Sequence, residues 1–163
     1  MEYFMPTWKL DAIDRRILDA LQMQGRLTNF ELAERVGLSP SPCLRRLRRL
    51  ESVGFIEGYG ARLNRLKIGL GLTVFVMVDM ERNRDSDATK FREFVLAMPE
   101  VISCYVTSGD HDFLLQVVVS DLAEYRRFAL ETLPKVPGVR SIHSSFAIDA
   151  VKENVPLPLS QSG

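Results

Sequence analysis

The sequence predicts an α+β protein with two domains, an N-terminal winged helix-turn-helix followed by a C-terminal ferredoxin-like βαββαβ domain. Three observations predict this fold class. Residues 9–53 carry apolar side chains at helical spacing in three segments with their own start and stop signals. From residue 72 onward, β-branched runs alternate with helical patterns. Charge is also divided: residues 1–67 hold 12 Lys/Arg against 8 Asp/Glu, whereas residues 68–163 hold 9 against 13.

The first two helices are marked by apolar spacing and by capping residues. Apolar residues recur about one turn apart from Leu10 to Leu21 and predict the first helix. The second opens with Thr28-x-x-Glu31, a capping-box pattern in which the two side chains satisfy free backbone N–H groups at the helix start. Gly37 suits its end, because a glycine tolerates the left-handed conformation that commonly follows a helix.

A third helix and a wing complete the N-terminal domain. Ser39 is a good N-cap and Pro40 is tolerated in the first turn, so we expect a helix that runs to about Val53. Residues 55–63 contain two glycines and predict a short hairpin, which would be the wing.

The second half is predicted to contain four strands and two helices. Strands are expected at Thr73–Val78, Val101–Thr107, Phe113–Val119 and Val139–Ile148, and helices at about 88–98 and 122–133. The pattern Pro-x-Val-x-Ser at residues 99–103 recurs at residues 137–141, each time between a helix and a strand, which indicates two βαβ units. Both helices would cover one face of the sheet. The other face is too apolar for water, which favours self-association.

These patterns divide the chain into a helix-turn-helix domain at residues 9–63, a hinge at 64–71, a ferredoxin-like domain at 72–153 and a disordered tail at 154–163. The apolar run from Leu70 to Met80 is far shorter than the ~20 residues of a membrane span. Because the N-terminus also lacks a signal-peptide pattern, we expect a cytoplasmic protein without membrane contact. Cys43 and Cys104 are too few for a disulfide framework, and we expect buried thiols.

The third helix combines an apolar face with an arginine-rich face, and no acidic residue occurs from Ser39 to Arg49. Arginine side chains in this position hold phosphates or read guanine in the major groove. A solvated basic face on an ordinary three-helix bundle is the alternative, but the preceding capped helix, the turn and the wing favour DNA binding. The residues expected to meet base edges are Ser39, Ser41, Pro42, Arg45 and Arg46, and those expected to hold the DNA backbone are Arg48 and Arg49.

The chain also resembles a known family over about residues 9–153. LDxxDRxIL at residues 10–18, VGLSPSPC at 36–43 and LExxGFIxGY at 50–59 resemble the leucine-responsive regulatory protein/AsnC (Lrp/AsnC) family of transcription regulators. The resemblance continues through SGDHDF at 108–113 and LPxVPGV at 133–139. It implies a ferredoxin-like C-terminal domain that binds amino acids at subunit interfaces. It also implies homodimers that assemble into tetramers or octamers.

The SGDHD segment holds two carboxylates one residue apart, which could bind an ammonium group, a metal ion or water, or could simply belong to a hairpin turn. The resemblance implies an effector-binding role for Gly109, Asp110 and Asp112. A carboxylate there would pair with the α-ammonium group of the ligand, while backbone N–H groups take its α-carboxylate. Val106, Thr107 and Thr132 are candidates for the pocket wall, and packing at an interface would explain them equally well.

We therefore predict a sequence-specific transcription regulator that binds a pseudo-palindromic DNA operator, with two recognition helices about one helical turn apart, and responds to an effector, by resemblance an amino acid. The alternative is a ligand-independent, DNA-organising protein with the same reading helix. An enzyme is not expected, because no nucleophile–base pair, oxyanion motif or phosphate loop accompanies Asp110 and Asp112. His111 and His143 have no zinc-site spacing, so neither a metal nor a cofactor is expected.

Overall fold

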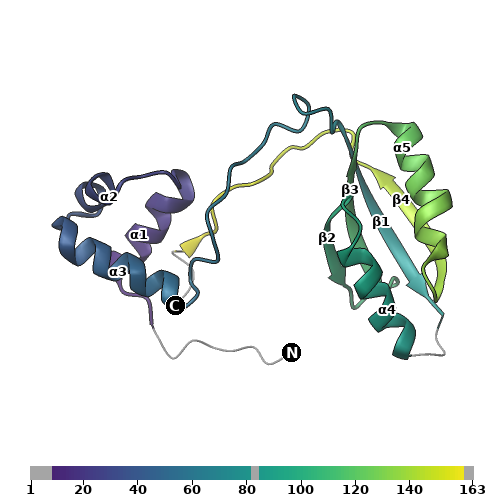
Figure 1. The fold of residues 1–163 in the computed structure, drawn as a ribbon, viewed down its shortest axis with the longest axis horizontal. Helices are drawn as coiled ribbons and strands as arrows, with labels where there is room; N and C mark the ends of the chain where they lie inside the picture. Colours follow the sequence, from purple (N-terminus) through teal and green to yellow (C-terminus); the bar gives the residue numbers. More distant parts are fainter. Residues whose placement is uncertain (1–8, 82–84, 160–163) are drawn as a thin grey trace. The chain divides into compact units, whose positions relative to one another are not determined.

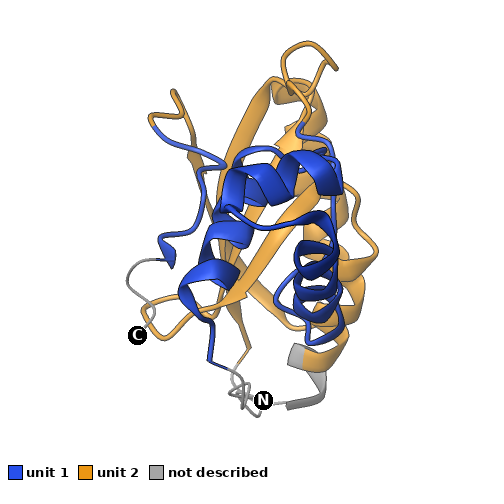
Figure 2. Ribbon diagram, turned by 90° about the vertical axis from the view of Figure 1, so that its left-hand side faces the viewer, with its two compact units in different colours: residues 1–62, 152–163 blue, residues 63–151 orange. Residues whose placement is uncertain are grey.

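A computed structural model describes residues 9–81 and 85–159. The chain divides into two compact units, which Figure 2 shows in different colours. The helical unit comprises residues 1–62 and 152–163, and the αβ unit comprises residues 63–151. No helix in the described part of the chain is long and apolar enough to cross a membrane.

The helical unit contains α1 (Ala12–Met23), α2 (Asn29–Val36) and α3 (Pro40–Ser52), as Figure 1 shows. The predicted capping box of α2 is confirmed: the Glu31 N–H donates to Oγ1 of Thr28 over 3.3 Å, and the Thr28 N–H donates to Oε2 of Glu31 over 2.7 Å. Gly37 takes the predicted left-handed conformation, with φ 72°. Ser39 occupies the N-cap position of α3, but its side chain makes no capping hydrogen bond, in contrast to the expectation.

The three helices pack around one small apolar core. Its fully buried members include Ile17 of α1, Leu32 and Val36 of α2, and Cys43 and Leu50 of α3. Leu32 and Val36 are one turn apart and Cys43 and Leu50 are two turns apart, so each pair belongs to the stripe that its helix buries. Burial raises the pKa of the Cys43 thiol, as expected for a structural cysteine.

The segment predicted as a wing hairpin, residues 55–63, contains no strand in the structure. Phe55 and Ile56 pack against the helical core instead. Tyr59 turns back toward α3, where its hydroxyl donates a hydrogen bond to Oε1 of Glu51 over 2.9 Å. Since an isolated two-stranded hairpin is only marginally stable, these contacts with the helices decide the path of the segment.

The αβ unit confirms the predicted βαββαβ order. Its elements are β1 (Leu72–Met80), α4 (Asp85–Leu96), β2 (Val101–Val106), β3 (Phe113–Val119), α5 (Leu122–Arg127) and β4 (Val139–Phe146). After α5 the chain continues through a π-helical turn, η1 (Phe128–Thr132), and a 3-10 turn, η2 (Leu133–Lys135). The sheet has the strand order β2-β3-β1-β4, and all neighbouring strands are antiparallel.

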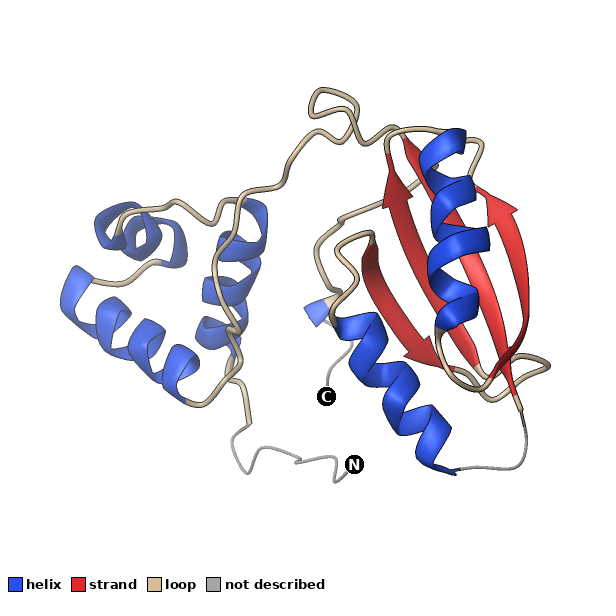
Figure 3. Ribbon diagram, turned by 45° about the vertical axis from the view of Figure 1, so that its right-hand side comes forward, coloured by secondary structure: helices blue, strands red, loops and turns tan. Residues whose placement is uncertain are grey.

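Helices α4 and α5 cover the same face of the sheet, as Figure 3 shows. Alternate residues of β1 and β3, such as Val76 and Leu115, are fully buried on that side. Phe91 of α4 packs on Phe113 of β3, with ring centroids 4.4 Å apart. The core of the unit therefore lies between the helices and one side of the sheet.

The opposite side of the sheet, which we call the open face, carries the intervening side chains. The strand register places Tyr105, Leu114, Met77 and His143 in one row across the four strands. Phe75 lies on the same side of β1 and is 38% exposed, and Tyr105 of β2 is 60% exposed. The prediction of an apolar, uncovered sheet face is consistent with this arrangement.

The C-terminal segment, residues 152–159, packs on the helical unit, whereas the sequence predicts a disordered tail. The backbone N–H of Leu157 donates to Oε1 of Gln22 over 2.6 Å, and Nε2 of Gln22 donates to the Leu157 carbonyl over 3.2 Å. The side chain of Leu159 is half-buried against the helical core, and its carbonyl accepts a hydrogen bond from Arg15 over 2.5 Å. The composition of this segment, in which proline and leucine alternate, predicts disorder. In the structure, however, Leu157 and Leu159 line a cavity beside Leu18 of α1. Residues 160–163 of the predicted tail lie outside the described residues.

Candidate DNA-binding surface and effector loop

Helix α3 presents most of the predicted DNA-reading residues to solvent. Ser39, Ser41, Arg45, Arg48 and Arg49 are exposed, and Pro42 is half-buried. The start of the helix is fixed to α2, because Nδ2 of Asn29 donates a hydrogen bond to the Pro40 carbonyl over 2.9 Å. The apolar side of α3, which includes Cys43 and Leu50, is anchored in the helical core. The predicted residues are thus held together on one helix whose buried side is rigidly packed.

Arg46 is placed differently from its arginine neighbours. Its Nη1 atom lies 2.6 Å from Oδ2 of Asp11 and 2.7 Å from Oδ1 of Asp14. Asp14 is only 3% exposed, so this guanidinium neutralises a nearly buried carboxylate. The pKa of Asp11 is lowered, first by the hydrogen bond from the Asp14 N–H and further by Arg46, and the two carboxylates raise the pKa of Arg46. The structure therefore gives Arg46 a role within the fold, tying α3 to the start of α1, where the sequence predicts contact with bases.

The ion pair of Arg46 is joined to a capping box that sequence reasoning missed. Asp11 caps α1, accepting hydrogen bonds from the Ile13 and Asp14 N–H groups over 2.8 Å each, while Asp14 accepts from the Asp11 N–H. The sequence does contain the pattern of this capping box, since Asp11 and Asp14 lie three residues apart at the start of an apolar helical pattern. Their pairing with Arg46, more than 30 residues later, has no local signal.

Four of the predicted effector residues, Thr107, Gly109, Asp110 and Asp112, belong to one loop between β2 and β3, which follows Val106 at the end of β2. The Thr107 N–H donates to the Asp112 carbonyl over 3.0 Å, and the Thr107 hydroxyl donates to the His111 carbonyl. Asp112 in turn connects the loop to β1: its N–H donates to the Val78 carbonyl over 3.1 Å, and its Oδ2 accepts from the Met80 N–H over 2.7 Å. The loop thus rests on the end of the central strand β1.

The two predicted carboxylates differ in what they contact. The Asp112 carboxylate is engaged by the Met80 N–H, whereas the exposed Asp110 carboxylate has no hydrogen bond or ion pair with any part of the chain that the structure describes. A Cβ atom at Gly109 would meet nothing within 4 Å, so the tip of the loop is open. Val106, at the end of β2, is exposed. Thr132 lies elsewhere in the chain, at the end of η1, and is also exposed.

A cavity of about 550 Å³ in the αβ unit lies away from this loop. It is lined by Gly71, Leu72, Ser120, Asp121, Leu122 and Phe146. Since Leu72 pairs with Val119 while Val78 pairs with Phe113, the cavity lies at the opposite end of the sheet. The loop of a single chain is therefore an exposed surface with one available carboxylate.

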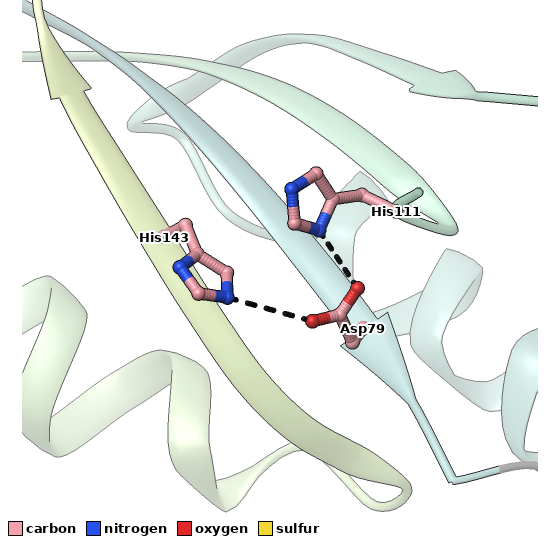
Figure 4. A group of neighbouring side chains, drawn as sticks. All are labelled: Asp79, His111 and His143. Atoms are coloured by element: carbon pink, nitrogen blue, oxygen red, sulfur yellow. Dashed lines mark hydrogen bonds and ion pairs between the residues drawn. The ribbon is translucent and has the colours of Figure 1, made fainter. Parts of the chain in front are cut away.

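His111 of this loop comes together on the open face with Asp79 and His143, residues that the sequence did not connect with it, as Figure 4 shows. Nδ1 of His111 lies 2.8 Å from Oδ1 of Asp79, and Nε2 of His143 lies 3.6 Å from Oδ2 of the same carboxylate. The pKa of Asp79 is lowered to about 2, first by a hydrogen bond from the Ser141 hydroxyl and then by His111. Asp79 and His143 belong to adjacent strands, and His111 precedes β3, so only the sheet pairing brings them together.

Comparison with known families accounts for both units. The model for the Lrp/AsnC ligand-binding domain matches residues 73–157, and a winged helix-turn-helix DNA-binding model matches residues 10–57. The chain belongs to the Lrp/AsnC family. It is 43% identical to the leucine-responsive regulatory proteins of Klebsiella pneumoniae and of Escherichia coli strain K12, over 149 residues that cover 91% of this chain and 91% of each relative.

Solved structures agree with this assignment. A transcriptional regulator from Neisseria meningitidis, crystallised as a complex with L-Met, superposes with a TM-score of 0.89 at 43% identity, covering 93% of this chain and 97% of the other. An AsnC family regulator from Agrobacterium tumefaciens gives a TM-score of 0.89 at 37% identity, covering 94% and 99%. The predictions of fold class and of family membership are confirmed. This Lrp/AsnC protein is a DNA-binding transcription regulator with a ligand-binding domain.

Proposed function

We propose that this regulator reads its operator with the exposed side of α3, using Ser39, Ser41, Pro42, Arg45, Arg48 and Arg49, while Arg46 holds the helix in place. The observation that carries this proposal is the contrast among the arginines. Arg45 and Arg48 are exposed on α3, whereas Arg46 is occupied by Asp11 and Asp14. Exposed guanidinium groups can reach phosphates or guanine edges, and the anchored helix presents them in a fixed orientation.

We propose that the effector of this regulator is an amino acid that binds at the Gly109–Asp112 loop. The Asp110 carboxylate supplies a partner for an α-ammonium group, and Gly109 leaves room for a ligand close to the backbone. The structural relative from Neisseria meningitidis was crystallised with L-Met, which supports an amino acid as the ligand class. Since the loop of one chain is an exposed surface, we infer that a second copy completes the pocket. Val106, Thr107 and Thr132 are then candidates for its wall.

We also propose that the protein associates with itself through the open face of the sheet. Phe75, Met77, Leu114 and Tyr105 give this side of the sheet an apolar surface that water covers at a cost. Two copies that bury it against each other form a homodimer, which positions two α3 helices for the half-sites of a pseudo-palindrome. Larger assemblies, tetramers or octamers, follow from further interfaces. We also propose that the protein acts in the cytoplasm and has no enzymatic activity.

DNA binding is tested by fluorescence anisotropy with a labelled operator at several salt concentrations. Arg45→Ala should weaken binding and reduce the slope of log K against log[salt] by about 1, because one phosphate or base contact is lost. Arg126→Ala, which removes an exposed arginine of α5 on the other side of the sheet, is the matched control and should bind like the parent protein. If neither Arg45→Ala nor Arg48→Ala changes the affinity for the operator, α3 does not form the DNA-binding surface and the proposal is wrong.

Effector binding is tested by calorimetry with each amino acid, using the parent protein and Asp110→Asn. We expect heat from at least one amino acid with the parent protein and none with Asp110→Asn. If no amino acid binds the parent protein while operator binding remains, the protein is a ligand-independent DNA organiser, and the effector proposal is wrong.

A further inference from the structure

We propose that Asp79, His111 and His143 form a binding site for a divalent transition-metal ion on the αβ unit. Each residue offers one ligand atom, and these atoms lie within 4.8 Å of one another. Figure 4 shows both imidazole rings turned toward the carboxylate. The rings themselves are close, with centroids 5.0 Å apart.

The two histidines lie beside different oxygens of Asp79, so the ligand atoms, now within 4.8 Å of one another, must move closer together to hold one ion. A zinc ion binds His nitrogen and carboxylate oxygen at about 2.0–2.2 Å, which places the ligand atoms of a tetrahedral site roughly 3.4 Å apart. The 3.6 Å separation between His143 and Asp79 is close to that value, and the 2.8 Å separation between His111 and Asp79 must widen slightly. The His143 side chain is 57% exposed in the single chain, so its ring can turn to bring Nε2 closer to the carboxylate.

The carboxylate at the centre of the cluster is already oriented. Asp79 is 5% exposed, and Oδ2 accepts a hydrogen bond from the Ser141 hydroxyl over 2.5 Å. Outer hydrogen bonds of this kind fix the carboxylates and imidazoles of metal sites in their binding geometry. The pairing of β1 with β4 places Ser141 directly opposite Asp79 and His143 opposite Met77, on the same side of the sheet.

One neighbouring charge opposes the ion. Nη2 of Arg140 lies 3.7 Å from Oδ2 of Asp79, so a cation in the cluster and the guanidinium compete for the same oxygen. Arg140 is 57% exposed in the single chain, so its guanidinium can turn away from Asp79 when an ion binds. Because the guanidinium competes with the ion, removal of the Arg140 side chain should strengthen metal binding.

The donor set selects the class of ion. Imidazole nitrogens suit Zn²⁺, Ni²⁺, Co²⁺ and Cu²⁺, whereas Mg²⁺ and Ca²⁺ prefer sites made of oxygen atoms alone. Three protein ligands leave at least one position for water or another small ligand. The sequence gives no local signal for this site, because His111 is 32 residues from Asp79 and 32 residues from His143.

The experiment is a calorimetric titration of the untagged, full-length protein in its native assembly with Zn²⁺ and Ni²⁺, and with Mg²⁺ for comparison. We expect one Zn²⁺ per chain, and an affinity that falls roughly 100-fold in His143→Ala and in His111→Ala. Ser141→Ala should cost about tenfold by loosening the carboxylate. Arg140→Ala should bind about fivefold more tightly, because one positive charge near the ion is gone.

Two controls separate this site from adventitious binding. Cys104 is exposed and free, in contrast to the expectation of a buried thiol, so Cys104→Ser must retain the full affinity. Cu²⁺ bound to the parent protein should show hyperfine coupling to two imidazole nitrogens in its electron paramagnetic resonance spectrum, and His143→Ala should show one. The proposal is overturned if the parent protein does not bind Zn²⁺ or Ni²⁺ more tightly than Mg²⁺. It is equally overturned if the histidine variants bind like the parent protein, or if binding depends on Cys104.

Discussion

Replacement of Arg46 by alanine tests whether this residue belongs to the fold or to the DNA interface. The substitution removes two short ion pairs, one to the half-exposed Asp11 and one to the nearly buried Asp14. An exposed pair contributes at most about 1 kcal/mol. A hydrogen bond to a charged and mostly buried group contributes roughly 1.5–3 kcal/mol, because its loss leaves the carboxylate poorly compensated.

We therefore expect Arg46→Ala to lower the free energy of unfolding of the helical unit by about 2–3 kcal/mol. For a unit of 60–100 residues, each kcal/mol shifts the melting temperature by about 4–8 °C, so the helical transition should move down by roughly 8–24 °C. The assay is thermal and urea unfolding followed by far-ultraviolet circular dichroism. Arg45→Ala is the matched control, and we expect its stability to change by less than about 0.5 kcal/mol.

A double-mutant cycle with Asp14→Asn identifies the pair itself. If the ion pair stabilises the unit, Arg46→Ala should cost about 1–2 kcal/mol less in the Asp14→Asn background than in the parent protein. DNA binding is measured on the same variants at a temperature where all are folded. The structural role of Arg46 is refuted if Arg46→Ala melts like the parent protein while the slope of log K against log[salt] for operator binding is reduced. Arg46 would then be a DNA-contacting residue.

Three further predictions concern single contacts. Asp112→Ala should destabilise the αβ unit by about 2 kcal/mol in urea unfolding, because the Met80 N–H loses its acceptor, whereas Asp110→Ala should leave stability unchanged within about 0.5 kcal/mol. Gln22→Ala should cost about 1 kcal/mol in the helical unit and should increase proteolytic cleavage of residues 152–159, since both hydrogen bonds to that segment are lost; parent-like cleavage would contradict the packing described above. Partial desolvation and the hydrogen bond with the Glu51 carboxylate raise the pKa of Tyr59 to about 12; because the ring is 54% exposed, the stability gained is small, complete below pH 10 and lost as the pH rises toward 12. A phenolate absorbance titration should show this late tyrosine, and Glu51→Gln should lower its pKa.

Local patterns predicted much of the fold correctly because they reflect local physics. The capping box of Thr28 and Glu31 and the left-handed Gly37 depend on residues within one helical turn. The βαββαβ order follows from the change between strand and helix periodicity, and the sheet order then leaves few alternatives. The resemblance to the Lrp/AsnC family drew on motifs in both halves of the chain.

Contacts between distant segments were out of reach of the same reasoning. Arg46 looked like its exposed neighbours, because nothing near it in sequence shows that Asp14 occupies its guanidinium. The grouping of Asp79 with two histidines depends on strand register, which one sequence does not reveal. The C-terminal segment was assigned to disorder by composition, although its leucines have an apolar surface to contact.

The return of residues 152–159 to the helical unit has a consequence for how the protein is made. The three helices leave the ribosome first, but the segment that completes their packing follows only after the whole αβ unit has been translated. At about 5–20 residues per second, this delay is on the order of 10 s. During that time the apolar surface around Leu18 is exposed on the nascent chain, where it is open to chaperones. Completion of the DNA-reading head is therefore linked to completion of the ligand-binding domain.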